Sequence, residues 1–205
     1  MPSDSNAVIV GIHVSSHSPD INHPLFPITA GQILFVKFED GSSDNILQGQ
    51  ILPNTHFRFG YAFLPNAQPG RYTAIGCTFH VGGKHPYSYT VLFDRPLITR
   101  LTRTVAPGTV ALLGNIVVSG IFQAQEEEYD DVQQHYFRKL TGKDIRTALR
   151  ERRGFFIQGG RLDGMPGRLK QEYPLDSSSR QFMNILLEGL PTAWQPWFDK
   201  RGPGP

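Results

Sequence analysis

Apolar side chains alternate with polar or small ones along most of the first 121 residues. Successive residues of a β-strand point to opposite faces of its sheet, so a period of two predicts strands. The pattern begins at Val8, Val10, Ile12 and Val14 and recurs over 34–38, 57–63, 75–81 and 87–93. We also expect strands through Leu97, Leu101 and Val105, and over 109–121, where the apolar run is more continuous.

Turn signals separate these segments, among them Pro69-Gly70, Gly82-Gly83 and Pro107-Gly108. The chain contains 21 glycines and 16 prolines among 205 residues, which is typical of a turn-rich folded protein rather than of low-complexity disorder. Short strands at this spacing favour an antiparallel sandwich or barrel. We therefore predict a mainly β fold, in which residues 6–121 form an antiparallel β-sandwich domain of about seven strands.

The periodicity becomes helical after residue 122. One helical stripe carries Tyr129, Val132, Tyr136 and Leu140. Gly142 is a suitable C-terminal cap for this helix, and Asp144 is a good N-cap for a second helix over 144–153. A third helix is predicted to begin near Ser178. Such short helices are unstable alone in water, so we expect 122–205 to be a helical extension packed on the sandwich and not an independent domain.

The last aromatic residues of the chain are Trp194, Trp197 and Phe198. Because tryptophan and phenylalanine bury large areas, we expect this cluster to close the protein's own core. A contact with another chain is the alternative. Cys77 is the single cysteine, and its place on an apolar strand face predicts a small buried residue rather than a catalytic thiol. One cysteine also excludes an intrachain disulfide.

Two Pro-Gly turns carry a resemblance to known families. The segment 64–72, LPNAQPGRY, resembles a turn of carboxypeptidase-regulatory-like and transthyretin-like β-sandwich domains. The segment 105–116, VAPGTVALLGNI, is similar to a phrase in uncharacterised bacterial envelope proteins and lipoproteins. The resemblance covers about 6–121 and implies a binding or structural module of the cell envelope. It transfers no catalytic residue, and the N-terminus has no lipobox cysteine.

This resemblance gives the first functional hypothesis, a non-catalytic module with a protein or envelope partner. No apolar run approaches the roughly 18 residues of a membrane span, so we expect no transmembrane segment. The residues after Met1 have no secretory signal pattern. The expected location is therefore the envelope or periplasm if a signal precedes Met1 in the native gene, and otherwise the cytoplasm.

The second hypothesis is an anion-binding module. Residues 132–170 contain ten basic and three acidic residues, after five acids within 126–131. A basic helix followed by the glycine-rich stretch 155–170, which we expect to be a loop, is suited to nucleic acid or lipid headgroups. The candidate contacts are Arg138, Lys139, Lys143, Arg146, Arg150 and Arg153. The alternative interpretation is a solvated helix face, partly neutralised by an acidic run that starts the helix.

The third hypothesis is a metal site. His80 and His85 flank the Gly82-Gly83 turn, so they would meet across a hairpin and hold a metal with a third ligand. The sequence contains no Walker loop, no Rossmann glycine fingerprint, no G-x-S-x-G elbow and no H-E-x-x-H motif. We therefore expect no cofactor, and the sequence favours a protein that is not an enzyme.

Overall fold

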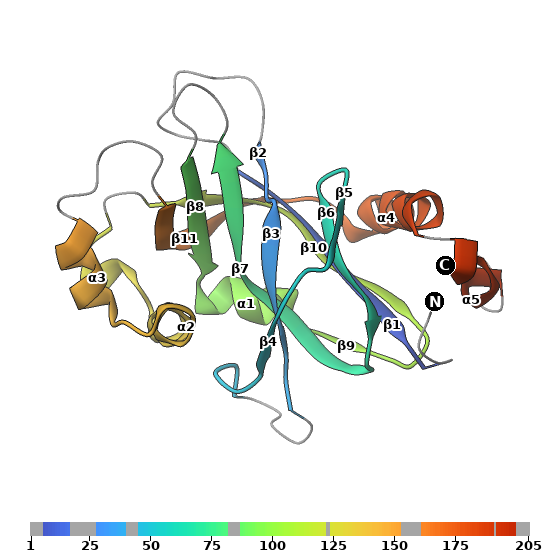
Figure 1. Ribbon diagram of the computed structural model, residues 1–205, viewed down its shortest axis with the longest axis horizontal. Coiled ribbons are helices and arrows are strands. Elements are labelled where there is room, and N and C mark those ends of the chain that lie inside the picture. The colour runs from blue at the N-terminus through green and yellow to red at the C-terminus, as the bar shows by residue number, and fades with distance from the viewer. Residues whose placement is uncertain are drawn as a thin grey trace.

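The computed structural model describes residues 6–16, 28–39, 45–81, 87–121, 124–152, 161–190 and 192–199 (Figure 1). The fold is mainly β, with helices that come mostly from the C-terminal part. Its strands are β1 (Val8–Ser16), β2 (Ile28–Thr29), β3 (Gln32–Lys37), β4 (Gln50–Pro53), β5 (His56–Arg58), β6 (Tyr61–Ala67), β7 (Gly70–Val81), β8 (Tyr87–Phe93), β9 (Arg103–Val105), β10 (Val110–Gly120) and β11 (Arg161–Glu172). Its helices are α1 (Arg95–Leu101), η1 (Glu126–Glu128), α2 (Asp131–Thr141), α3 (Ile145–Arg152), α4 (Leu175–Gly189), η2 (Thr192–Trp194) and α5 (Gln195–Asp199).

The described strands form one curled sheet in the order β4-β3-β7-β8-β11-β10-β1-β6-β5, with β2 beside β1 and β9 beside β7. The sheet is mixed, because β1 pairs in parallel with β10 and β11 pairs in parallel with β8. The expectation of an antiparallel sandwich of about seven strands is therefore wrong in its pairing. Alternating hydrophobicity reports which face is buried but not the direction of the neighbouring strand, and parallel neighbours need long crossover connections.

β11 lies between β8 and β10, so the C-terminal part supplies an inner strand as well as helices. The prediction of a loop over 155–170 is wrong for 161–170, while 155–160 lies outside the described residues. The glycines of this strand permit close packing rather than mobility. A Cβ at Gly167 would lie 2.2 Å from Cγ1 of Val91 on β8, and one at Gly164 would lie 2.2 Å from Cδ2 of Phe137 on α2.

Two further predicted strands have a different structure. Residues 95–101 form α1, whose N-cap Asp94 accepts a hydrogen bond from the Leu97 amide at 3.0 Å. The 97 and 101 positions are both buried, because a spacing of four places them on one helical face. The predicted strand over 57–63 is a hairpin, in which Phe59 and Gly60 form the turn between β5 and β6.

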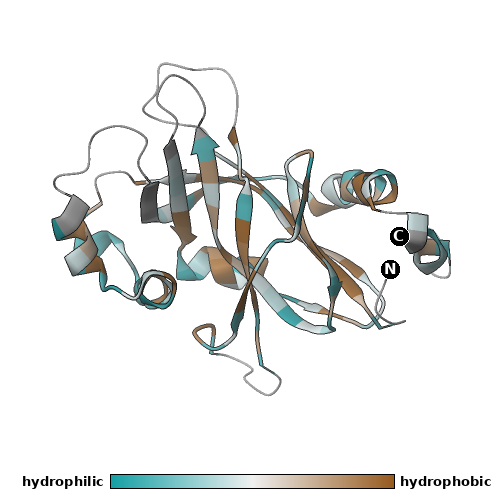
Figure 2. Ribbon diagram, viewed as in Figure 1, coloured by the Kyte–Doolittle hydropathy of each residue, from teal (hydrophilic) through white to brown (hydrophobic). Residues whose placement is uncertain are grey.

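The core lies on both faces of the sheet. On one face, Val10 of β1 belongs to a large cluster that includes Phe35, Phe79 and Cys77. Burial raises the pKa of the Cys77 thiol well above its ordinary value. Hydrophobic residues are concentrated along the strands and on α1 (Figure 2). The opposite face carries Ile9, which packs with Phe182 of α4 and with the aromatic cluster Trp194, Trp197 and Phe198. The C-terminal aromatic residues are thus part of the protein's own core, as predicted.

The C-terminal helices lie at the two ends of the sheet (Figure 1). Helices α4 and α5 pack beside β1 and β6, whereas α2 and α3 pack against Leu92 of β8. The predicted α2 and α3 are confirmed, including the left-handed cap Gly142 at φ 72°. α4 begins at Leu175, before the predicted Ser178, and among the described helices none is long and apolar enough to cross a membrane.

Candidate functional site

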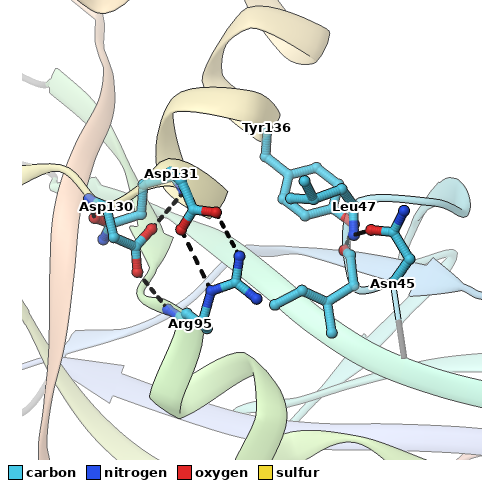
Figure 3. A network of polar contacts seen from close by, with 8 residues as sticks. Asn45, Leu47, Arg95, Asp130, Asp131 and Tyr136 are labelled. Carbon is cyan, nitrogen blue, oxygen red and sulfur yellow. Dashed lines mark hydrogen bonds and ion pairs between the residues drawn. The ribbon is translucent and has the colours of Figure 1, made fainter. Parts of the chain in front are cut away.

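Two hydrogen bonds join helix α2 to the segment that precedes β4. The Tyr136 hydroxyl donates to the Ile46 carbonyl at 2.6 Å, and the Lys139 ammonium donates to the Gly49 carbonyl at 2.8 Å. Figure 3 shows the Tyr136 side chain beside this segment. Lys139, one of the anion-binding candidates, therefore has a structural contact with the protein's own backbone.

The start of α2 uses part of the acidic run. Asp130 caps the helix, and one of its carboxylate oxygens accepts from the Arg95 amide at 2.6 Å. The Arg95 guanidinium binds the Asp131 carboxylate through Nε at 3.3 Å and through a terminal nitrogen at 2.5 Å (Figure 3). The hydrogen bond from Arg95 lowers the pKa of Asp131. These contacts support the interpretation of the acidic run as a helix start.

A pocket of about 250 Å³ opens between η1, α2 and α3. Its lining consists of Glu126, Gln134, Arg138, Asp144, Ile145 and Arg146. Two of the predicted anion contacts are thus brought together from different helices. The short connection makes this possible, because the left-handed cap Gly142 ends α2 soon after Arg138 and α3 begins just before Arg146.

The charged side chains of this pocket are paired in part. Arg146 donates from Nε to the Glu126 carboxylate at 2.9 Å, and this hydrogen bond raises the pKa of Arg146. Asp144 accepts from the Thr147 amide at 2.7 Å. Hydrogen bonds from the Thr147 amide and hydroxyl lower the pKa of Asp144, and the charges of Arg138 and Arg146 lower it further. Asp144 and Arg146 are consequently ionised at neutral pH.

The first turn of α3 also faces this pocket. Ile145 and Arg146 are the first two residues of the helix, where backbone amides have no partner inside the helix. The positive end of the helix dipole lies at the same place. Two guanidinium groups and a helix N-terminus together form an environment that favours an oxyanion, whereas Glu126 and Asp144 oppose a large negative charge.

The other basic candidates lie elsewhere. Lys143 is in the connection between α2 and α3, Arg150 is exposed on α3, and Arg153 lies outside the described residues. Further along, Arg168 and Lys170 are exposed on β11. The described segment 124–152 contains seven acidic and six basic residues, and η1 packs its acids beside α3. Within this segment, the basic residues of α2 and α3 are therefore balanced by nearby acids.

His80 is exposed near the end of β7, and its Nδ1 shares a hydrogen bond with the Ser88 hydroxyl of β8 at 2.8 Å. His85 lies outside the described residues, so the predicted pairing of these histidines stays a prediction. Within the described part of the chain, no three His, Cys, Asp or Glu side chains are grouped so that they would hold a metal ion.

A polar cluster lies between the sheet and α4, and the sequence did not predict it. His13 of β1 is paired with Asn115 of β10, and the His13 Nδ1 and Asn115 Oδ1 atoms are both buried without a hydrogen bond. Burial lowers the pKa of His13, and the neighbouring Asn115 side chain opposes this shift only in part. The Asn115 amide donates to Ser178 of α4, so the cluster positions this helix. No local signal pairs two strands that are about a hundred residues apart in the chain.

Comparison of the chain with protein-family models, with curated proteins and with solved structures found no match. The resemblance of 64–72 and 105–116 to sandwich and envelope proteins therefore stays a prediction.

Proposed function

We propose that this protein is a non-catalytic binding module, and that the pocket between η1, α2 and α3 holds a small ligand with an anionic group. The observation that supports this most is the convergence of Arg138 and Arg146, from two helices, on one pocket. A partner in the cell envelope is part of the proposal and rests on the resemblance of 64–72 and 105–116 alone.

The ligand oxyanion accepts hydrogen bonds from the two guanidinium groups. Arg146 uses its Nε for Glu126, which leaves its terminal nitrogens for the ligand. The first-turn amides of α3 add donors at the positive end of the helix. Planar guanidinium groups suit carboxylate and phosphate because they bind two oxygens of such a group at once.

The size and charge of the pocket favour a small molecule over a nucleic acid. A volume of about 250 Å³ is below that of pockets for drug-sized ligands. A nucleic acid surface needs an extended basic face, whereas acids and bases are balanced around this pocket. A ligand with one phosphate or carboxylate group fits both properties.

Calorimetric titration with inorganic phosphate at low salt tests this proposal. We expect Arg138→Gln and Arg146→Gln each to weaken binding by about tenfold, the effect of losing a hydrogen bond to a charged group. Arg150→Gln is the matched control, since it removes the same charge from an exposed position on α3. It should keep the wild-type affinity apart from a small effect of net charge. Equal losses in all three variants, or no binding by the wild type, would contradict the proposal.

A further inference from the structure

The turn between β5 and β6 has an unusual residue in a strained conformation. Phe59 and Gly60 both have positive φ, 48° and 82°, as in the two-residue hairpin turn that usually contains Asn-Gly. Positive φ places the Cβ of an L-residue too close to the backbone, so a phenylalanine is strained here. A Cβ at Gly60 would lie 2.6 Å from Nε2 of His13, so the turn also packs tightly on β1.

This strained turn exposes aromatic side chains to solvent. The Phe59 side chain is 67% exposed at the tip, and Phe57, on the edge strand β5, is 43% exposed. Between them, Arg58 donates to the Glu188 carbonyl at the end of α4 at 3.2 Å. Its guanidinium carbon also lies 5.1 Å from the centre of the Phe59 ring. The hairpin tip is thus held in place before any partner arrives.

We propose that this hairpin tip, residues 57–60, docks the protein on an anionic lipid surface. Phe59 and Phe57 enter the interfacial region of the bilayer, and Arg58 stays at the level of the headgroups. Arg58 is suited to this role because its guanidinium donates to a main-chain carbonyl, which does not offset its charge as a carboxylate would. This inference is independent of the ligand proposed for the pocket at α2 and α3.

The small area of the tip favours a lipid surface over a protein partner. At about 200 Å² for a phenylalanine, the exposed parts of the two side chains amount to roughly 200 Å². A stable protein interface buries about 800 Å² on each partner. A projecting aromatic turn needs a deep pocket in a protein partner, whereas a bilayer interface accepts it without a preformed site. Binding through so few side chains is weak and reversible.

Vesicle flotation of the whole protein tests the proposal, with phosphatidylcholine vesicles that do or do not contain phosphatidylglycerol. We expect the wild type to float with the anionic vesicles at low salt. Phe59→Asn should reduce the bound fraction by about tenfold or more, because most of the exposed apolar area is lost. Asparagine accepts positive φ, so this variant keeps the turn, and a cooperative melting transition confirms that it is folded. Arg58→Gln should weaken binding to anionic vesicles about fivefold and leave neutral vesicles unaffected.

Leu140→Asn is the matched control, since Leu140 is another exposed apolar residue, at 39%, on α2. It should float like the wild type. A wild type that fails to float, or a Phe59→Asn variant that floats equally well, overturns the proposal. Self-association that depends on Phe59, without flotation, would assign the tip to a protein contact and would also overturn it.

Discussion

The side-chain amide of Asn115 on β10 donates to the hydroxyl of Ser178 on α4 at 2.9 Å. This contact joins an inner strand of the sheet to a helix that begins 60 residues later in the chain. Around it, Ile9 and Leu112 of the sheet pack against Phe182 and Leu186 of the helix. Helix α4 is therefore held on the sheet by apolar packing and by the hydrogen bond between Asn115 and Ser178. The two contributions can be tested separately.

Replacement of the hydroxyl, Ser178→Ala, should lower the free energy of unfolding by about 1 to 2 kcal/mol. The half-buried Asn115 amide would lose its acceptor, and an unsatisfied buried donor is costly. Urea denaturation measures this loss. Ser177→Ala is the control, since Ser177 is exposed on the same helix, and it should change stability by less than about 0.5 kcal/mol. Equal effects of the two variants would argue against a specific role of the Asn115 contact.

The close approach of β1 and α4 at Gly11 gives a second prediction. A Cβ at Gly11 would lie 2.2 Å from Cζ of Phe182, so Gly11→Ala must displace the ring or the helix. We expect a loss of about 1 to 3 kcal/mol, as for other overpacked sites. The double variant Gly11→Ala/Phe182→Leu should recover part of this loss, because the smaller side chain leaves room for the methyl group. Additive losses in a double-mutant cycle would show that the two residues do not compete for space.

Relief of the strain at Phe59 should stabilise the protein. Phe59→Asn replaces a residue that disfavours φ 48° with one that accepts it. We expect the free energy of unfolding to rise by about 1 kcal/mol, reduced by the lost contact with Arg58. Thermal melting and urea denaturation measure the change. A loss of stability would mean that the Phe59 ring contributes more to packing than its exposure indicates.

The partial burial of His13 predicts that the stability of the protein depends on pH. Its pKa is lowered from the ordinary 6.5, so near and below that pH the unfolded chain binds a proton that the folded chain does not. Acidification then favours unfolding, and stability should fall as the pH decreases through about 6.5 towards the lowered pKa. His13→Gln should show a smaller fall in denaturation experiments between about pH 7.5 and pH 5.

His80→Gln is the control for this experiment, because His80 is exposed near the end of β7. It should keep the wild-type dependence of stability on pH. If the two variants lose stability equally on acidification, another group is responsible. Titration of the His13 ring followed by NMR would then identify whether its pKa is lowered at all.

The parts of the fold that sequence predicted are those with local causes. Gly142 and Asp144 end one helix and start the next, and each acts on backbone groups within four residues. Asp94 is an equally local signal, because it is the N-cap of α1. The sequence around it was nevertheless interpreted as strand, because the flanking segments have alternating apolar residues. Arg138 and Arg146 were recognised as basic residues, yet their convergence on one pocket required the geometry of the turn between them.

The parts that sequence did not predict depend on long-range pairing. β11 contains two glycines, Gly164 and Gly167, where Leu92 and Val91 of β8 lie against it. Read alone, the same glycines resemble a loop. His13 and Asn115 lie on two strands that pair in parallel. Parallel strands are not joined by a short turn, so no turn signal in the sequence indicates that they are neighbours. Phe59 followed the alternation of a strand, and only its neighbour Gly60 pointed to a turn.

The most direct test of the proposed binding function is a map of where an anion binds. Backbone amide shifts of the ¹⁵N-labelled protein, followed by NMR during titration with inorganic phosphate, locate the site without substitution. We predict saturable shifts that are largest at Ile145 and Arg146, at the first turn of α3. Shifts confined to the exposed bases Arg168 and Lys170 on β11, or spread over the surface without saturation, would contradict a binding site at this pocket.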